Sequence, residues 1–206
     1  TLSLAKFNRI LKIDPASRTA TVQCGVRNLA ISEAAAPHGL YYAPDPSSQI
    51  ACTIGGNVAE NSGGVHCLKY GLTLHNVQRV KGYTIEGEVV EFGGLALDAA
   101  GLDLLAVVIG SEGMLAVTTE VTVKLVPEPL LARAIMASFA DVRAAGDAVA
   151  AIIAAGIIPA GLEMMDKPMT AAVDDFVHAG HDLAAAAILL CESDGTPEEG
   201  GEETQR

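Results

Sequence analysis

The segment at residues 44–64, PDPSSQIACTIGGNVAENSGG, concentrates residue types that can hold a ligand through the backbone. Thr53 is a suitable N-cap for a short helix that would begin with IGGNVAEN. Because glycine lacks a Cβ atom, Gly55 and Gly56 would let the backbone approach a ligand closely. N–H groups at the start of a helix favour an anion such as a diphosphate. By itself the pattern fits a ligand site and an ordinary glycine-rich turn equally well.

A second segment, GSEGMLAVTTEVTVKL at residues 110–125, joins a tight Gly-Ser-Glu-Gly turn to a run of β-branched residues typical of a strand. The sequence contains no G-x-x-x-x-G-K-[ST] motif and no G-x-G-x-x-G motif after a strand. It also lacks the G-x-S-x-G elbow of many serine hydrolases. These absences remove the commonest nucleotide-binding loops and one hydrolase class from consideration.

Metal-ligand side chains occur near the first segment. His66 is followed by Cys67, and Cys52 or His75 could complete a set. Their spacing matches no zinc template, so we expect no metal.

Three further candidates each have a structural alternative. His178 and His181 would share a face of a helix only if it extended through both, and a solvated loop is the simpler expectation. Glu163 and Asp166 lie at a strand-to-helix corner, where carboxylates are usually structural although a substrate-side role is open. Lys69 could pair with a diphosphate or a substrate carboxylate, or be a surface lysine.

Alternating and helical patterns predict the elements that would position the first two segments. They are a hairpin of 8–14 and 18–24, a helix from an N-cap at Asn28 to Gly39, strands at 77–81 and 83–92 with a Glu86-Gly87 turn, a helix or strand at 102–110 and a strand at 114–126.

The run PEPL, at residues 127–130, breaks this pattern. Beyond it we expect strands at 132–139, 161–165 and 184–191, alternating with helices at 141–155 and 168–179. This order is that of an opening ferredoxin-like α+β layer. The predicted fold class is α+β, with one domain at 1–127 and another at 128–206.

Composition excludes several classes of protein. The chain of 206 residues has a net charge of -12, no Trp and 4% aromatic residues, which argues against nucleic-acid binding. The four cysteines form no C-x-x-C pair, and we expect reduced thiols of a cytoplasmic protein. The longest apolar run, at residues 183–191, is too short to span a membrane.

In order and spacing, PDPSSQIACTIGGNVAENSGG, CLKYG and GSEGMLAVTTEVTVKL together resemble the FAD-binding domain of vanillyl-alcohol-oxidase-type flavoproteins. Within that superfamily they are most similar to the flavin-carrying large subunit of glycolate oxidase and to D-lactate dehydrogenases. The resemblance implies that FAD is held by small residues and backbone groups from both segments and from Tyr70-Gly71. The implied cofactor-binding residues are Pro46, Ser47, Cys52, Thr53, Ile54, Gly55, Gly56, Asn57, Ala59, Asn61, Gly63, Gly64, Tyr70, Gly71, Glu112, Gly113, Met114, Leu115, Ala116, Val117 and Thr118.

The sequence departs from the family pattern in three places. Ala116 stands where the family has glycine, and an alanine there would be strained if the backbone φ were positive. An upstream glycine-rich diphosphate loop and a downstream histidine and acid cluster are not found. We therefore expect an internal fragment, with the C-terminal part of the FAD domain and the start of a substrate domain. No catalytic residue is assigned.

The resemblance implies oxidation of a small 2-hydroxy acid, such as glycolate or D-lactate, to the 2-oxo acid, with hydride passing to flavin N5. The alternative is a non-catalytic fragment or subunit-interaction module that does not hold FAD by itself. Partner subunits that carry an electron acceptor, and a homo-oligomer, are compatible with the resemblance. Such subunits could place a cytoplasmic protein at the periphery of the inner membrane.

Overall fold

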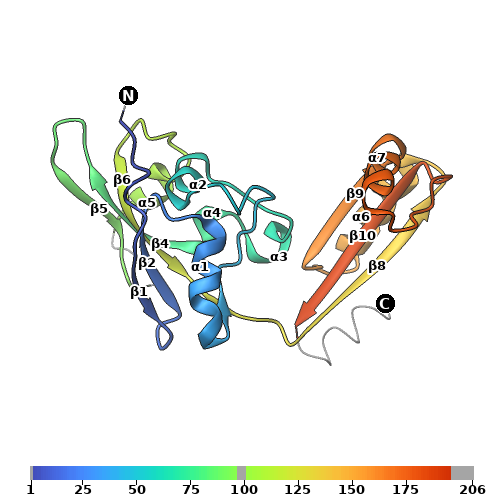
Figure 1. Cartoon of the computed structure of the whole chain (residues 1–206), viewed down its shortest axis with the longest axis horizontal. Coiled ribbons are helices and arrows are strands. Elements are labelled where there is room, and N and C mark those ends of the chain that lie inside the picture. The colour runs from blue at the N-terminus through green and yellow to red at the C-terminus, as the bar shows by residue number, and fades with distance from the viewer. Residues whose placement is uncertain (1, 97–100, 196–206) are drawn as a thin grey trace. The chain divides into compact units, whose positions relative to one another are not determined.

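The computed structural model describes residues 2–96 and 101–195. It divides into two compact units, Thr1–Glu128 and Pro129–Arg206, one residue beyond the predicted boundary. The units are coloured blue to green-yellow and yellow to red in Figure 1. Each unit is described by itself.

The first unit is built on a five-stranded antiparallel sheet in the order β1-β2-β6-β4-β5. The strands are β1 (Ile10–Asp14), β2 (Thr19–Gln23), β4 (Val77–Tyr83), β5 (Val89–Gly93) and β6 (Val117–Lys124). The predicted hairpin of residues 8–24 is confirmed as β1–β2. β4 and β5 also form a hairpin, but β4 continues to Tyr83, which the sequence analysis assigned to the second strand. The longer prediction at 114–126 was wrong at its start, because Met114–Ala116 precede the strand.

Short helices and a small strand pair complete this unit. They are α1 (Asn28–Ala35), the 3-10 helix η1 (Ala36–His38), α2 (Ile54–Glu60), α3 (Cys67–Tyr70), α4 (Thr73–Asn76), α5 (Leu104–Val108), β3 (Leu40–Tyr41) and β7 (Val126–Pro127). Figure 1 shows α1 to α4 on one side of the sheet. The ambiguous segment at 102–110 therefore contains a helix.

The core of the first unit lies between this sheet and α1 and α2. Ile31 of α1 and Ile54 of α2 are fully buried, together with Val22, Val80 and Val121 from the three inner strands. Because β-branched side chains pack well on a pleated surface, the strands that contribute most to this core are those predicted most easily from sequence.

Asn28 is not the N-cap of α1, as the sequence suggested. The helix begins at Asn28 itself, and Arg27 is the N-cap residue with an extended backbone. The Asn28 side chain is instead fully buried and donates a hydrogen bond to the carbonyl oxygen of Pro44 at 2.9 Å. The polar residue therefore serves a tertiary contact rather than the end of its own helix.

The second unit is a three-stranded antiparallel sheet in the order β8-β10-β9 with two helices. Its elements are β8 (Leu131–Phe139), α6 (Val142–Ala154), β9 (Gly161–Asp166), α7 (Lys167–Val177) and β10 (Ala187–Gly195). Asp141 and Asp166 cap α6 and α7 through their carboxylates. The β-α-β-α-β order is confirmed, while the last strand lies a few residues later than predicted.

Candidate cofactor site

The two glycine-containing segments meet at one cavity of about 400 Å³ in the first unit. Eight of the residues predicted to bind cofactor line it: Thr53, Gly55, Gly56, Ala59, Gly113, Ala116, Val117 and Thr118. The sheet brings these segments together, because β6 follows the second segment and α2 packs against β6. Residues separated by more than fifty positions thus form one wall.

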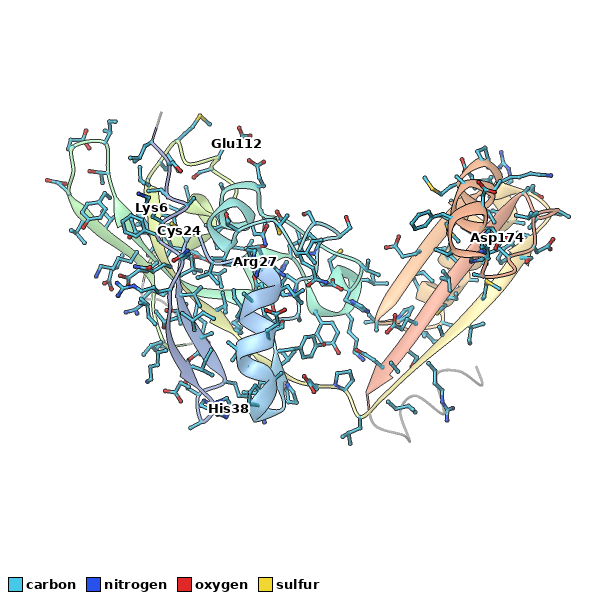
Figure 2. The ribbon with its side chains drawn as sticks, viewed as in Figure 1. Lys6, Cys24, Arg27, His38, Glu112 and Asp174 are labelled. Atoms are coloured by element: carbon cyan, nitrogen blue, oxygen red, sulfur yellow. The ribbon has the colours of Figure 1, made fainter. Side chains whose placement is uncertain are left out.

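The sequence analysis did not predict the other residues that line the cavity. They are Leu2, Leu4, Ala5, Cys24, Gly25, Val58, Val108 and Ser111. Cys24 and Gly25 follow the end of β2, and Figure 2 labels Cys24 there and Glu112 on the turn before β6. No local sequence pattern marks Cys24 and Gly25, because they reach the cavity only through the pairing of β2 with β6.

Gly55 is required for a reason other than the one predicted. A Cβ atom on Gly55 would lie 2.7 Å from Cys24 Cβ and 2.9 Å from the Cys24 carbonyl oxygen. The close approach is therefore to the protein's own backbone. Gly56 differs, because a Cβ atom there would meet only Thr53 Oγ1, at 3.4 Å.

The N–H groups that begin α2 are already hydrogen-bonded within the protein. Ile54 N donates to the Val26 carbonyl at 2.9 Å and Gly55 N donates to the Cys24 carbonyl at 2.8 Å. Gly56 N donates to Thr53 Oγ1 at 3.3 Å, which confirms Thr53 as the N-cap. These donors already have partners within the protein, and an anion site at this helix start stays a prediction.

The turn at residues 110–113 is fixed by backbone contacts to α2. Gly110 N donates to the Val58 carbonyl at 2.8 Å, and Glu112 N donates to the Ala59 carbonyl at 2.9 Å. Glu112 and Gly113 have φ values of 56° and 73°, and no atom lies within 4 Å of a Cβ placed on Gly113. The absence of a side chain at Gly113 therefore leaves open space beside the cavity.

The backbone strain that the family pattern suggested for Ala116 does not occur. It is absent from the described residues with positive φ, and it is buried at the edge of the cavity. Alanine is thus compatible with the backbone at this position.

The remaining predicted residues do not line the cavity, in the part of the chain that the structure describes. They are Pro46, Ser47, Cys52, Ile54, Asn57, Asn61, Gly63, Gly64, Tyr70, Gly71, Glu112, Met114 and Leu115.

Two of these residues are committed to contacts within the protein. Asn57 is buried and its Nδ2 donates to Asn28 Oδ1 at 2.8 Å, while Asn61 Oδ1 accepts from Leu74 N at 2.9 Å. Ile54 is in the core, whereas Met114 is 81% exposed. Only a ligand that extends beyond this cavity could contact the exposed members of the set.

Burial and charge give the cavity an apolar character. No Asp, Glu, Lys, Arg or His lines it among the described residues. Burial raises the pKa of the Cys24 thiol, which keeps this side chain neutral. A ligand here would be held by backbone groups, by small hydroxyls such as Thr53 and by apolar contacts.

The other candidates from the sequence do not form a second site. No cluster of three or more potential metal ligands occurs within residues 2–96 and 101–195. His178 ends α7 with a φ of 54°, and His181 lies beyond the helix with its Nδ1 3.0 Å from Asp174 Oδ1. The two histidines therefore do not share a helix face. Glu163 is exposed on β9, and Lys69 Nζ lies 5.7 Å from the centre of the Tyr70 ring.

Comparisons with known proteins agree with this architecture. Residues 1–93 match the family model for the FAD binding domain, and residues 129–206 match the C-terminal domain of FAD linked oxidases. An alkyldihydroxyacetonephosphate synthase structure aligns with a TM-score of 0.82 at 22% identity, over 98% of this chain and 39% of that one. This likeness shows the fold.

Relatives with curated names are closer in sequence. Glycolate oxidase subunit GlcD of Escherichia coli (strain K12) is 62% identical over 205 residues, which cover 100% of this chain and 41% of the relative. GlcD of Bacillus subtilis (strain 168) is 46% identical over 92% of this chain and 40% of the relative. D-lactate dehydrogenase of Anaerostipes hadrus is 32% identical over 96% of this chain and 43% of the relative.

The first unit thus matches an FAD-binding domain, and the second matches the C-terminal domain of FAD linked oxidases. Residues 1–93 belong to the FAD-binding domain family and residues 129–206 to the family of C-terminal domains of FAD linked oxidases, and the chain spans about two fifths of the length of the relatives named above. FAD is the cofactor of this family, and the cavity fits part of it: Gly113 leaves space, small residues dominate, and 400 Å³ lies in the range of ligand pockets. No described helix is both long and apolar enough to cross a membrane.

Proposed function

We propose that the complete protein containing this chain uses FAD to oxidise a small 2-hydroxy acid, of the glycolate or D-lactate type, to the 2-oxo acid. The observation that carries this proposal is the 62% identity to a glycolate oxidase subunit along 205 residues. The D-lactate dehydrogenase at 32% identity supports the same substrate class.

Within the chain, we assign the cavity to the cofactor rather than to the acid. A substrate carboxylate is best bound by a cationic or strongly donating side chain, and no charged side chain lines this cavity among the described residues. Backbone groups and small side chains suit a large, neutral part of a dinucleotide. When bound, FAD supplies the electron acceptor for the oxidation.

The residues of the cavity would bind and orient the cofactor. Thr53 keeps the start of α2 in place, and the turn at Gly113 leaves room for the ligand. Val58 and Val108 offer apolar contacts and exclude water from the bound group. The oxidation itself removes a hydride from the α-carbon and a proton from the hydroxyl group, at a position that this cavity does not define.

The name "subunit" of two relatives supports a second proposal, that the complete protein works with partner subunits that carry an electron acceptor. We place this assembly in the cytoplasm, with contact to the inner membrane only through those partners. Isolation of the tagged complete protein from its own cells, followed by identification of bound chains, tests this proposal.

Anaerobic reduction of bound flavin tests the proposed reaction. The complete protein is loaded with FAD, freed of unbound cofactor and mixed with glycolate, D-lactate or D-2-hydroxyglutarate, with L-lactate as a stereochemical control. Bleaching of the visible flavin band by glycolate or D-lactate, with formation of the 2-oxo acid, is the expected result. An FAD-loaded protein that none of these acids bleaches would contradict the proposal.

A further inference from the structure

Both ends of the loop at residues 44–52, between β3 and α2, are hydrogen-bonded to the buried residue Asn28. Asn28 Nδ2 donates to the Pro44 carbonyl at 2.9 Å, and Asn28 N donates to the Cys52 carbonyl at 3.0 Å. Asn28 is fully buried, so these contacts are protected from water. The loop that carries Pro46 and Ser47 therefore has fixed ends.

A second contact fixes the start of this loop, at Asp45. The ring Nδ1 of His66 lies 2.6 Å from Asp45 Oδ2, and His66 N donates to Asp45 Oδ1 at 3.3 Å. The side chains of His66 and Asp45 are 26% and 21% exposed, so solvent screens the pair only partly. Because carboxylate oxygens accept hydrogen bonds, we assign His66 Nδ1 as the donor in this contact.

The local sequence is shaped around this pair. Asp45 lies between Pro44 and Pro46, whose rings restrict the backbone on both sides of it. A Cβ atom on Gly64 would overlap the side chain and backbone of Asp45. Glycine at position 64 thus allows the segment before His66 to approach the loop at residues 44–52.

The pair joins the loop that leads into Thr53 to the segment that follows Ala59, and both Thr53 and Ala59 line the cavity. Asp45 directly precedes Pro46 and Ser47, while His66 lies two residues after Gly64 and four residues before Tyr70. We propose that Asp45 and His66 are positioning residues for FAD, whose contact holds the loop at 44–52 and the segment at 63–64 at the separation that bound cofactor requires. This inference rests on FAD binding by the segment 44–64.

The same chain offers a matched control. His181 Nδ1 lies 3.0 Å from Asp174 Oδ1, with side-chain exposures of 11% and 18%, in the second unit. This pair has the same chemistry and similar burial but lies outside the unit that matches the FAD-binding family. A general loss of stability would follow removal of either pair, whereas a positioning role concerns only the first.

The test compares FAD affinity with the stability of the cofactor-free protein. His66→Ala, Asp45→Ala, the double variant, His66→Asn and His181→Ala are made in the complete protein. FAD dissociation constants come from titration of flavin fluorescence, and melting temperatures are recorded without FAD. Asp45→Asn keeps the volume of the side chain and replaces the alanine variant if that variant does not fold.

We expect His66→Ala and Asp45→Ala each to raise the FAD dissociation constant at least tenfold. The double variant should be no more than twofold weaker than either single variant, because both remove the same contact. His66→Asn, which retains an N–H donor near the Nδ1 position, should recover most of the affinity. His181→Ala should lower the melting temperature and leave the affinity within twofold of wild type.

FAD affinity within twofold of wild type in the folded His66 and Asp45 variants would overturn the inference, and so would strictly additive effects in the double variant. The outcome is separable from that of the proposed reaction. Weaker FAD binding in these variants, with no bleaching of the wild-type flavin by any hydroxy acid, would remove the substrate proposal and leave the positioning role in place.

Discussion

Two adjacent glycines at the start of α2 have different physical roles. Gly55 has no room for a side chain because Cys24 lies against it, whereas Gly56 faces free space beside the cavity. The sequence shows both as one GG motif, and only the contact of Gly55 with Cys24 in the folded protein distinguishes them. A substitution at Gly55 is therefore expected to affect folding, whereas one at Gly56 is expected to affect ligand binding.

Substitution of the two glycines should separate folding from cofactor binding. Gly55→Ala forces a shift of Cys24 and should lower the free energy of unfolding by about 1–3 kcal/mol. Gly56→Val should leave the free energy of unfolding within about 1 kcal/mol of wild type while sharply reducing FAD retention. Thermal melting and the flavin content after gel filtration check both. A folded Gly56→Val protein with normal flavin content would remove Gly56 from the site.

Ala116→Gly should destabilise the protein. Ala116 has no positive φ to relieve, so the dominant effect is the extra backbone freedom of glycine in the unfolded chain. We expect a loss of about 0.5–1 kcal/mol, measured as a lower unfolding midpoint in denaturant. A higher midpoint would show that the alanine is strained after all.

At the level of elements, prediction succeeded where local chemistry decides the structure. Thr53 caps α2 as its type suggests, and the β1–β2 hairpin follows from the turn between two alternating runs. It failed where a tertiary contact competes, as for Asn28, which begins α1 but points to Pro44. The cavity shows the same limit: its glycines were predictable, but Cys24 and Val108 were not, because only the folded sheet and α5 bring them to α2.

Asp14, the last residue of β1, has a carboxylate whose charge stabilises the β1–β2 hairpin. Lys12 Nζ lies 2.7 Å from Asp14 Oδ2, and Ser17 N donates to Asp14 Oδ1 at 3.1 Å. The hydrogen bond from Lys12 is the main cause that lowers the pKa of Asp14 from 3.8 to about 2, with that from Ser17 second. The charged form is therefore favoured in the folded state.

Removal of the Asp14 carboxylate should lower the stability of the protein at neutral pH but not at strongly acidic pH. A depressed folded pKa contributes stability that is present above pH 3.8 and is lost as the pH falls towards 2. Asp14→Asn should therefore melt below wild type at pH 7, with the difference shrinking between pH 3.8 and 2. In Lys12→Met, NMR titration should show the pKa of Asp14 rising towards its ordinary value. An unchanged pKa in that variant would exclude Lys12 as the main cause.

At the scale of the whole molecule, cavity and charge predict how residues 1–206 behave alone. The cavity holds only part of a dinucleotide, its described lining has no cation for a diphosphate, and the chain has a net charge of -12. Each missing charge-assisted contact is worth about 1.5–3 kcal/mol, so loss of several weakens binding by orders of magnitude.

We therefore expect residues 1–206, mixed with excess FAD and passed over gel filtration, to retain little flavin and to show no dehydrogenase activity. The complete protein is the control and should leave the column yellow. A stoichiometric flavin complex of residues 1–206 that glycolate or D-lactate bleaches would contradict this expectation.

The order of the five-stranded sheet has a consequence for synthesis on the ribosome. The middle strand β6 is made last, yet it pairs with β2, and Thr21 Oγ1 lies 3.1 Å from Thr122 Oγ1 across 101 positions of sequence. At roughly 5–20 residues per second, β2 waits about 5–20 s for its partner. During that interval the nascent hairpins β1–β2 and β4–β5 each expose an unpaired inner edge, which is the form of chain that chaperones bind and that aggregates most readily. Ribosome-bound chains that stop before Val117 should therefore be captured by chaperones far more than chains extended well past Lys124.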